Sequence, residues 1–160
     1  MFVRFFPEEQ MTRVVLLLVL VILSRPPVHG QTSALDNKAI ARRYFQEILN
    51  EGRIEAINAI VATDVVFRNP PAVVRGIDEF RKLVAGLRAA FPDLHFTLED
   101  ELGEGDKVAT RWVMRGTQGT RRMDVSGMDI FLITGGKIKE IWVNMDTLAQ
   151  ARQLGQVAGP

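Results

Sequence analysis

The sequence predicts an α+β domain in which helices precede an antiparallel sheet. Two observations support this fold class. Between residues 35 and 91 most apolar side chains recur three or four positions apart, which is typical of amphipathic helices. After residue 94, apolar and polar side chains alternate, which is typical of strands with one buried face.

The first half of the domain is expected to hold three helices and one short strand. The helices span residues 35–50, 54–60 and 77–91, and the strand spans residues 65–67. Gly52 and Pro92 end the first and third helices. Asn69-Pro70-Pro71 ends the strand.

The second half is expected to be an antiparallel meander. Its strands span residues 94–100, 107–115, 123–133 and 137–145, and a short helix follows at residues 147–154. Gly135-Gly136 joins the last two strands as a hairpin. The main elements therefore run α-α-β-α-β-β-β-β, and helices on one face of a curved sheet would leave a pocket between the two layers.

The N-terminus reads as a secretory signal peptide covering residues 1–30. An apolar run from Val14 to Leu23 follows the basic residues Arg4 and Arg13, and small residues come before Gln31. Cleavage after Gly30 or after Ala34, a start at Met11, and an uncleaved membrane anchor are the alternatives. We expect a short linker at 31–36, the domain at 37–155 and a frayed tail at 156–160, in a protein that is secreted or periplasmic.

Composition excludes several classes of function. The chain has no cysteine, so it has neither disulfides nor thiolate chemistry. Removal of residues 1–30 leaves 17 basic (20 − 3) and 17 acidic (19 − 2) residues, a balance that disfavours a nucleic-acid partner. No phosphate loop, nucleophile elbow or metal-ligating carboxylate cluster is present, and we expect no metal or cofactor.

Asp146 is the candidate acid/base. Strand periodicity places Trp142, Asn144 and Asp146 on one face, together with Ile138 and Glu140. If that face lines a cavity, the apolar setting would raise the pKa of the Asp146 carboxyl and suit it to proton transfer. The alternative is that Asp146 caps the following helix, a role that Asp fills well.

Other residues are candidates for binding a substrate. Arg68 and Asn69 end the first strand and could hold a carbonyl or carboxylate at the cavity mouth, or could be a surface arginine and a turn asparagine. Trp112 and Trp142 could form pocket walls, or could be ordinary core residues. Asp129 is expected either to face away from the core or to pair with Arg111, and the pair is favoured. The complete set of expected binding residues is Tyr44, Arg68, Asn69, Trp112, Met128, Trp142 and Asn144.

Four stretches carry motifs of a known family. They are Asn37-Lys38 through Arg42-Arg43-Tyr44-Phe45 with Asn50-Glu51-Gly52; Arg68-Asn69-Pro70-Pro71 before Arg75-Gly76; Phe91-Pro92-Asp93-Leu94; and Val125-Ser126-Gly127-Met128-Asp129-Ile130 through Gly136-Lys137-Ile138 to Asp146 and Gln153-Leu154-Gly155. In this order and spacing they resemble the SnoaL-like polyketide cyclases, or ester cyclases. These belong to the nuclear transport factor 2-like and ketosteroid-isomerase-like superfamily.

The resemblance implies a cone-shaped fold, with three N-terminal helices on the concave face of the sheet. It also implies a cofactor-free pocket for a hydrophobic ester or ketone, with an aspartate near the last strand, by position Asp146, as acid/base for ring closure or isomerisation. The rival function is an exported, non-catalytic binding module for a small hydrophobic ligand. A homodimer formed through the sheet is also expected.

This chain departs from the family pattern. Many relatives have His-Asp-Pro in place of Arg68-Asn69-Pro70, and Glu-His-Trp in place of Glu140-Ile141-Trp142. Several have a histidine in place of Gln118. His95 is the only histidine after residue 30. Imidazole catalysis and a zinc site of several histidines are therefore not expected.

Overall fold

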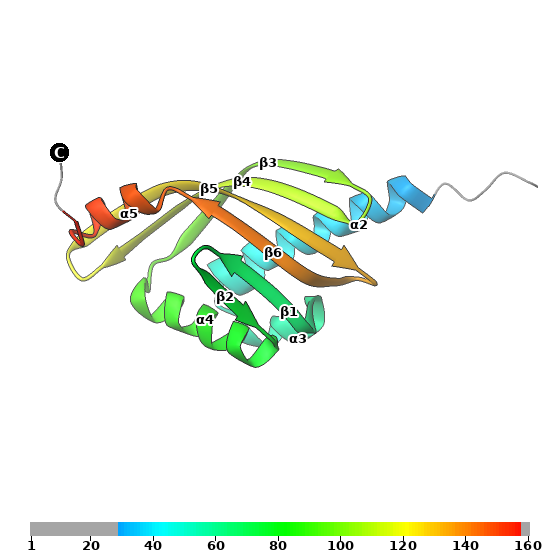
Figure 1. The fold of residues 1–160 in the computed structure, drawn as a ribbon, viewed down its shortest axis with the longest axis horizontal. Coiled ribbons are helices and arrows are strands. Elements are labelled where there is room, and N and C mark those ends of the chain that lie inside the picture. The colour runs from blue at the N-terminus through cyan, green and yellow to red at the C-terminus, as the bar shows by residue number, and fades with distance from the viewer. Residues whose placement is uncertain (1–28, 158–160) are drawn as a thin grey trace, which may run out of the picture.

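The structure is a computed structural model that describes residues 29–157 (Figure 1). Most of the predicted signal peptide lies outside these residues. The predicted α+β class is confirmed: helices cover one face of a curved, six-stranded, mostly antiparallel sheet, as in the cone fold of nuclear transport factor 2-like proteins. None of the helices in the described range is long and apolar enough to cross a membrane.

The helices follow the predicted order with shifted ends. They are α2 (His29–Arg43), its continuation as a π-helix η1 (Tyr44–Asn50), the 3-10 helix η2 (Ile54–Ala56), α3 (Ile57–Ile60), α4 (Ile77–Ala90) and α5 (Thr147–Gln153). Helix α2 begins before the predicted residue 35 and includes residues 31–36. Helix α4 carries Asp78 and Glu79 in its first turn, where carboxylates stabilise the helix dipole.

The strands form a single sheet in the order β2-β1-β6-β5-β4-β3. They are β1 (Val61–Asn69), β2 (Ala72–Arg75), β3 (His95–Glu104), β4 (Lys107–Gln118), β5 (Arg121–Thr134) and β6 (Lys137–Met145). Strand β1 runs parallel to β6, and the other neighbouring pairs are antiparallel. The short edge strand β2 is not among the predicted strands, because the sequence pattern indicates only that Pro70-Pro71 ends β1, whereas the chain turns there and pairs back on β1.

A β-bulge at Lys139 reverses the face assignment of β6. Ile133 pairs with Ile138, whereas the preceding residue Leu132 pairs with Glu140, so β6 contains one extra residue. Ile138 and Ile141 are therefore both fully buried although they lie three positions apart. The prediction that Ile138 shares a face with Trp142, Asn144 and Asp146 is wrong for this reason.

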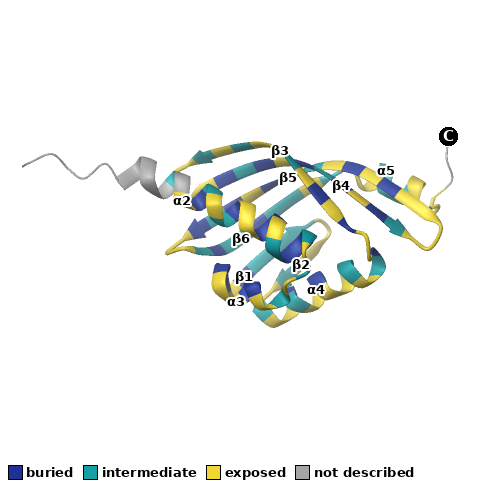
Figure 2. Ribbon diagram, turned by 180° about the vertical axis from the view of Figure 1, so that it is seen from behind, coloured by how far each residue is buried: buried dark blue, intermediate teal, exposed yellow. Residues whose placement is uncertain are grey.

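The core lies between the helices and the sheet face toward which they pack, here called the inner face. Buried and exposed residues alternate along β4 and β5, as Figure 2 shows. Along the π-helix η1, Tyr44, Phe45, Ile48 and Leu49 are all buried. The ring of Tyr44 packs 5.3 Å from that of Phe131 on β5, so η1 is joined directly to the centre of the sheet.

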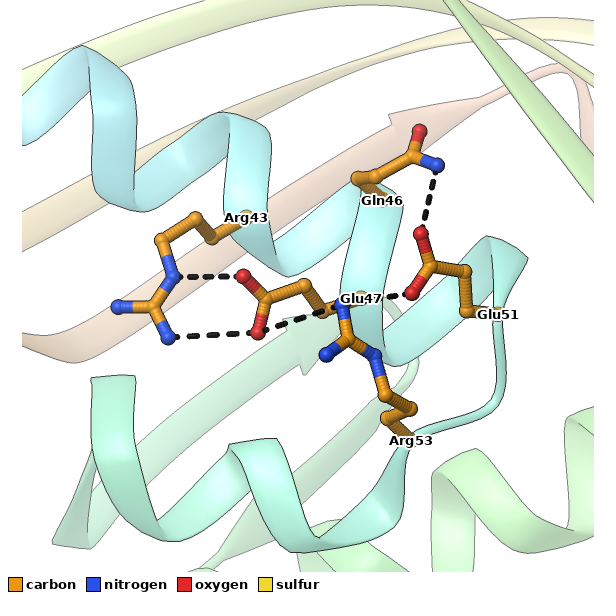
Figure 3. Close-up of polar contacts among 5 residues, drawn as sticks. All are labelled: Arg43, Gln46, Glu47, Glu51 and Arg53. Carbon is orange, nitrogen blue, oxygen red and sulfur yellow. Dashed lines mark hydrogen bonds and ion pairs between the residues drawn. The ribbon is translucent and has the colours of Figure 1, made fainter.

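The outer side of η1 carries an exposed polar network (Figure 3). Arg43 pairs with Glu47 at 2.7 Å, and Arg53 pairs with Glu51 at 2.6 Å. Gln46 donates a hydrogen bond of 2.8 Å to Glu51. Exposed pairs of this kind contribute at most about 1 kcal/mol each, so the network helps to hold the turn after η1 and forms no enclosed site.

Candidate functional site

A cavity of about 150 Å³ lies between the inner face of the sheet and helices η1 and α4. Its lining is largely apolar and includes Phe67, Phe80, Leu83, Val84, Leu87, Phe96, Met114, Val143 and Met145. Its polar lining residues are Tyr44, Asn69, Trp112, Asp129 and Gln150. An apolar enclosure with a few converging polar groups is the usual form of a small-molecule site.

Asp129 is the acidic residue of this cavity. It lies on β5, opposite Thr110 of β4 and Val143 of β6, and it is only 3% exposed. Its Oδ1 atom has no hydrogen-bond partner among the described residues. Burial raises the pKa of the Asp129 carboxyl from 3.8 to about 7, while the nearby Trp112 indole N–H opposes this rise. A carboxyl with this pKa can both accept and donate a proton near neutral pH.

Trp112 reaches Asp129 from the neighbouring strand. Its indole lies over Gly127, the residue opposite it on β5, and only a glycine leaves room for the ring there. Trp112 is 2% exposed, and its Nε1 atom makes no hydrogen bond of good geometry with any described residue, Asp129 included. The indole N–H and the Asp129 carboxyl therefore lie close together without completing a hydrogen bond of good geometry.

Tyr44 approaches the carboxyl from the helical side of the cavity. Burial, and to a smaller extent the negative charge of Asp129, raise the pKa of the Tyr44 hydroxyl well above its usual value. The hydroxyl therefore stays protonated near neutral pH and can donate a hydrogen bond into the cavity.

A row of polar side chains continues across the sheet behind Asp129. Glu101 of β3 lies opposite Thr110, which in turn lies opposite Asp129. Thr110 Oγ1 and Glu101 Oε1 are also buried without a partner in the described structure. The other carboxylate oxygen of Glu101 accepts a hydrogen bond of 2.5 Å from Arg42 on α2. Neither residue lines the cavity, so this row is a second layer behind the site.

Three of the expected binding residues line the cavity: Tyr44, Asn69 and Trp112. Asn69 is the last residue of β1 and lies on the same side of that strand as Phe67, two positions earlier. The structure thus brings together one predicted residue from a helix and two from strands that are distant in the sequence.

The other expected site residues lie outside the cavity. Arg68 pairs at 3.3 Å with Glu140, and Trp142 lies beside it in register on β6. Met128 is half exposed and lines a second hollow, of about 250 Å³, with Arg111 and Leu102. Asn144 is exposed and lies opposite Met128. The bulge at Lys139 explains why Trp142 and Asn144 do not line the cavity. It shifts the alternation of β6 by one residue, so that Val143 and Met145 face the cavity instead.

Asp146 occupies the N-cap position of α5. Its Oδ1 atom accepts a hydrogen bond of 2.8 Å from the backbone N–H of Ala149, and the residue is exposed. This is the capping geometry that was the alternative to an acid/base role. Its predicted role in proton transfer stays a prediction, and the geometry of the cavity favours Asp129.

Asp129 is the residue that sequence reasoning missed. The expectation that it pairs with Arg111 is wrong, because Arg111 lies on the opposite face and binds Glu99 and Asp100. A signal was present in the sequence. The buried face of β5 is formed by Met123, Val125, Phe131 and Ile133, and Asp129 lies an even number of positions from each of them, so its side chain points to the same face. A carboxylate in an otherwise buried strand face is a candidate functional group.

No three His, Cys, Asp or Glu side chains converge as a metal site within residues 29–157. The polar groups of the cavity are one carboxyl, one phenol, one indole N–H and two amides. Such a set can bind and polarise a carbonyl group and can move a proton.

Comparison with known proteins places the chain in a family. The sequence profile of SnoaL-like polyketide cyclases matches residues 39–154, which is most of the chain. The chain belongs to the SnoaL-like polyketide cyclase family. No curated protein is similar enough to this SnoaL-like chain to count as a match.

Solved structures agree with this family. TsrD from Streptomyces laurentii is 29% identical, with a TM-score of 0.69 over 77% of this chain and 97% of its own. A candidate polyketide cyclase from Bacillus cereus is 28% identical, with a TM-score of 0.73 over 83% of this chain and 89% of its own. A candidate SnoaL-like cyclase from Jannaschia is 21% identical, covers 86% of this chain and 99% of its own at a TM-score of 0.73, and shows the shared fold. The family supports a cyclase- or isomerase-type function in general.

Proposed function

We propose that this SnoaL-like protein is a cofactor-independent cyclase or isomerase in which Asp129 moves a proton at the carbon beside a carbonyl group. The substrate would be a small hydrophobic ketone or ester. The observation that carries the proposal is the placement of Asp129, a buried carboxyl with an unpartnered oxygen at the wall of an apolar cavity.

The reaction requires two proton transfers. The Asp129 carboxylate first accepts a proton from the α-carbon, and the C–H electron pair forms an enolate. In an isomerisation the carboxyl returns the proton to another carbon of the conjugated system. In a ring closure the enolate carbon attacks a second carbonyl of the same molecule, and the new alkoxide receives the proton. The pKa of Asp129, near 7, suits both steps.

The proposal can be tested without knowledge of the natural substrate. Cyclohexanone has exchangeable α-protons, and nuclear magnetic resonance (NMR) spectroscopy follows their replacement by deuterium in D2O. We expect the wild-type protein to accelerate this exchange above pH 7, where Asp129 is a carboxylate. Asp129→Asn should slow the protein-catalysed exchange by about 100-fold or more, the usual scale of general-base catalysis.

Asp146→Asn is the matched control, because it replaces the other candidate carboxylate and Asn is also a good helix cap. We expect this variant to exchange cyclohexanone at the wild-type rate. An Asp129→Asn protein as active as wild type would reject the proposed role of Asp129. If Asp146→Asn lost activity and Asp129→Asn did not, Asp146 would be the acid/base residue.

The second candidate function is an exported, non-catalytic module that binds a small hydrophobic ligand. The mainly apolar lining of the cavity and the signal-like segment before it favour this function. Saturable binding of cyclohexanone without α-proton exchange would support it over catalysis. N-terminal sequencing of the protein recovered outside the cytoplasm tests the export, and we expect the mature chain to begin near Gln31 or Leu35.

A further inference from the structure

We propose that the Trp112 indole N–H holds the carbonyl oxygen of the substrate beside Asp129, and that the cavity selects compact carbonyl compounds built on one six-membered ring. This inference rests on the proposed function, because it names the second group of the same site and the class of substrate that fits it.

The first argument is the unpartnered donor. Buried indole N–H groups usually have a hydrogen-bond partner, and leaving one without a partner costs free energy. Nε1 of Trp112 lies near enough to the Asp129 carboxyl to lower its pKa, but it makes no hydrogen bond of good geometry with any described residue, although Trp112 is almost fully buried and lines the cavity. A ligand oxygen inside the cavity would complete its hydrogen bonding.

The second argument is the position of the donor relative to the base. Trp112 and Asp129 lie on paired strands, and each is two positions from the residue directly opposite the other. An aromatic side chain spans such a diagonal, so the indole N–H lies close to the carboxyl. The oxygen and α-carbon of a carbonyl compound are two bonds apart. One donor at the oxygen and one base at the α-hydrogen therefore match the enolisable unit.

The third argument is rigidity. A Cβ atom on Gly127 would lie 2.4 Å from Cη2 and 2.5 Å from Cζ2 of Trp112, so the ring lies tightly against the sheet. The indole also makes an edge-to-face contact with Phe96, with ring centroids 5.1 Å apart. A donor fixed before the ligand enters stabilises a developing enolate without a reorganisation cost.

The size of the cavity sets the substrate class. An apolar protein cavity of about 150 Å³ holds one benzene ring, and this cavity has about the same volume. One six-membered ring therefore fits with its carbonyl group at Trp112 and Asp129. A fused two-ring ketone is larger than this cavity, whose lining includes Leu83 and Leu87 of α4.

The first experiment uses the wild-type protein. The chain has two tryptophans, so its ¹H–¹⁵N NMR spectrum shows two indole signals, and Trp142→Phe assigns them. We expect cyclohexanone to shift the Trp112 signal downfield and to leave the Trp142 signal in place. Methylenecyclohexane, which has nearly the same shape and no oxygen, should enter the cavity without that downfield shift. Equal shifts of the Trp112 signal with both probes would contradict a hydrogen bond from the indole N–H to the carbonyl oxygen.

The second experiment measures α-proton exchange of cyclohexanone by Trp112→Phe, with Trp142→Phe as control. Loss of one oxyanion donor typically lowers kcat by about 100-fold or more, and we expect that loss for Trp112→Phe only. Binding of methylenecyclohexane should be retained. Wild-type exchange by Trp112→Phe, when Asp129→Asn is inactive, would reject the role of Trp112 and leave the proposed function intact.

The third experiment tests size. We expect saturable binding of cyclohexanone and at least tenfold weaker binding of the two-ring ketone 2-decalone, with Leu83→Ala reducing the difference. Equal affinity of the wild-type protein for both ketones would reject the single-ring class. It would not affect the assignment of either Asp129 or Trp112.

Discussion

Gly127 and Trp112 are opposite one another on β5 and β4, and the indole occupies the space that a side chain at residue 127 would need. The absence of a side chain at one position thus determines where the largest aromatic ring of the cavity lies. This pair connects a single glycine in the sequence to the geometry of the site.

Gly127→Ala tests this relationship. The added methyl group must push the indole away, and overpacking of this kind usually costs about 1–3 kcal/mol. We expect a lower free energy of unfolding in urea and a changed indole NMR signal for Trp112. Gly86→Ala is the control: Gly86 lies on the exposed side of α4 with open space around it, so alanine there should stabilise the helix. An unchanged Trp112 signal in Gly127→Ala would contradict the close packing.

Asp129 should make the stability of the protein depend on pH. Its pKa is about 7 in the folded protein and near 3.8 in the unfolded chain. Between these values the folded state holds one more proton than the unfolded state, so the free energy of unfolding falls as pH rises from about 4 to 7. The loss over this window is up to about 4 kcal/mol, at about 1.4 kcal/mol for each pKa unit.

Asp129→Asn removes this titration. We expect the variant to lose most of the stability difference between pH 4.5 and pH 8, and to be more stable than wild type at pH 8. Urea unfolding at several pH values measures both effects. If the free energy of unfolding of the wild-type protein instead rose with pH across that window, the pKa of the Asp129 carboxyl would not be raised by burial.

The bulge at Lys139 predicts which residues of β6 support the core. Ile141 is fully buried, so Ile141→Ala should cost about 2–5 kcal/mol. Asn144 lies on the exposed face, and Asn144→Ala should change the free energy of unfolding by less than about 0.5 kcal/mol. An unbroken alternation from Ile138 would give the reverse order, so thermal unfolding of the two variants decides between the assignments.

The exposed outer face of the sheet is where we expect a homodimer to form. Leu102, Met128 and Ile130 are large apolar residues exposed on β3 and β5 of this face. Burial of such a surface between two copies is favourable. Light scattering should show a dimer for wild type and a monomer for Ile130→Lys. Leu148→Lys changes an exposed apolar residue on α5 and should remain dimeric; a wild-type monomer would contradict the expectation.

Much of the fold could be predicted from the sequence, because helices and strands with one buried face have distinct apolar spacing. The bulge escaped prediction because it changes no residue type. Its trace is the pair Ile138 and Ile141, two apolar residues separated by two polar ones within a strand. Because this one extra residue is not predicted, Trp142 is assigned to the inner face and Val143 to the outer face, the reverse of the structure.

The candidate site was predicted only in part for a related reason. Tyr44, Asn69 and Trp112 lie where the stripes and strand ends indicated. Asp129 alternates with the apolar residues Met128 and Ile130, which indicates an outward-facing carboxyl, but these two residues are themselves exposed and Asp129 faces the core. Residues at functional sites often break the pattern of their element, so the break itself is informative.

The parallel pairing of β1 with β6 determines when the protein can fold during synthesis. The last strand to leave the ribosome lies in the interior of the sheet, with β1 on one side and β5 on the other. Until β6 is available, the β1–β2 hairpin and the β3–β4–β5 meander have no shared hydrogen-bonded partner. Folding therefore waits for a contact between distant parts of the chain, which slows it. A chain that ends before residue 137 would expose two unpaired strand edges, so truncated products of this protein should be prone to aggregation.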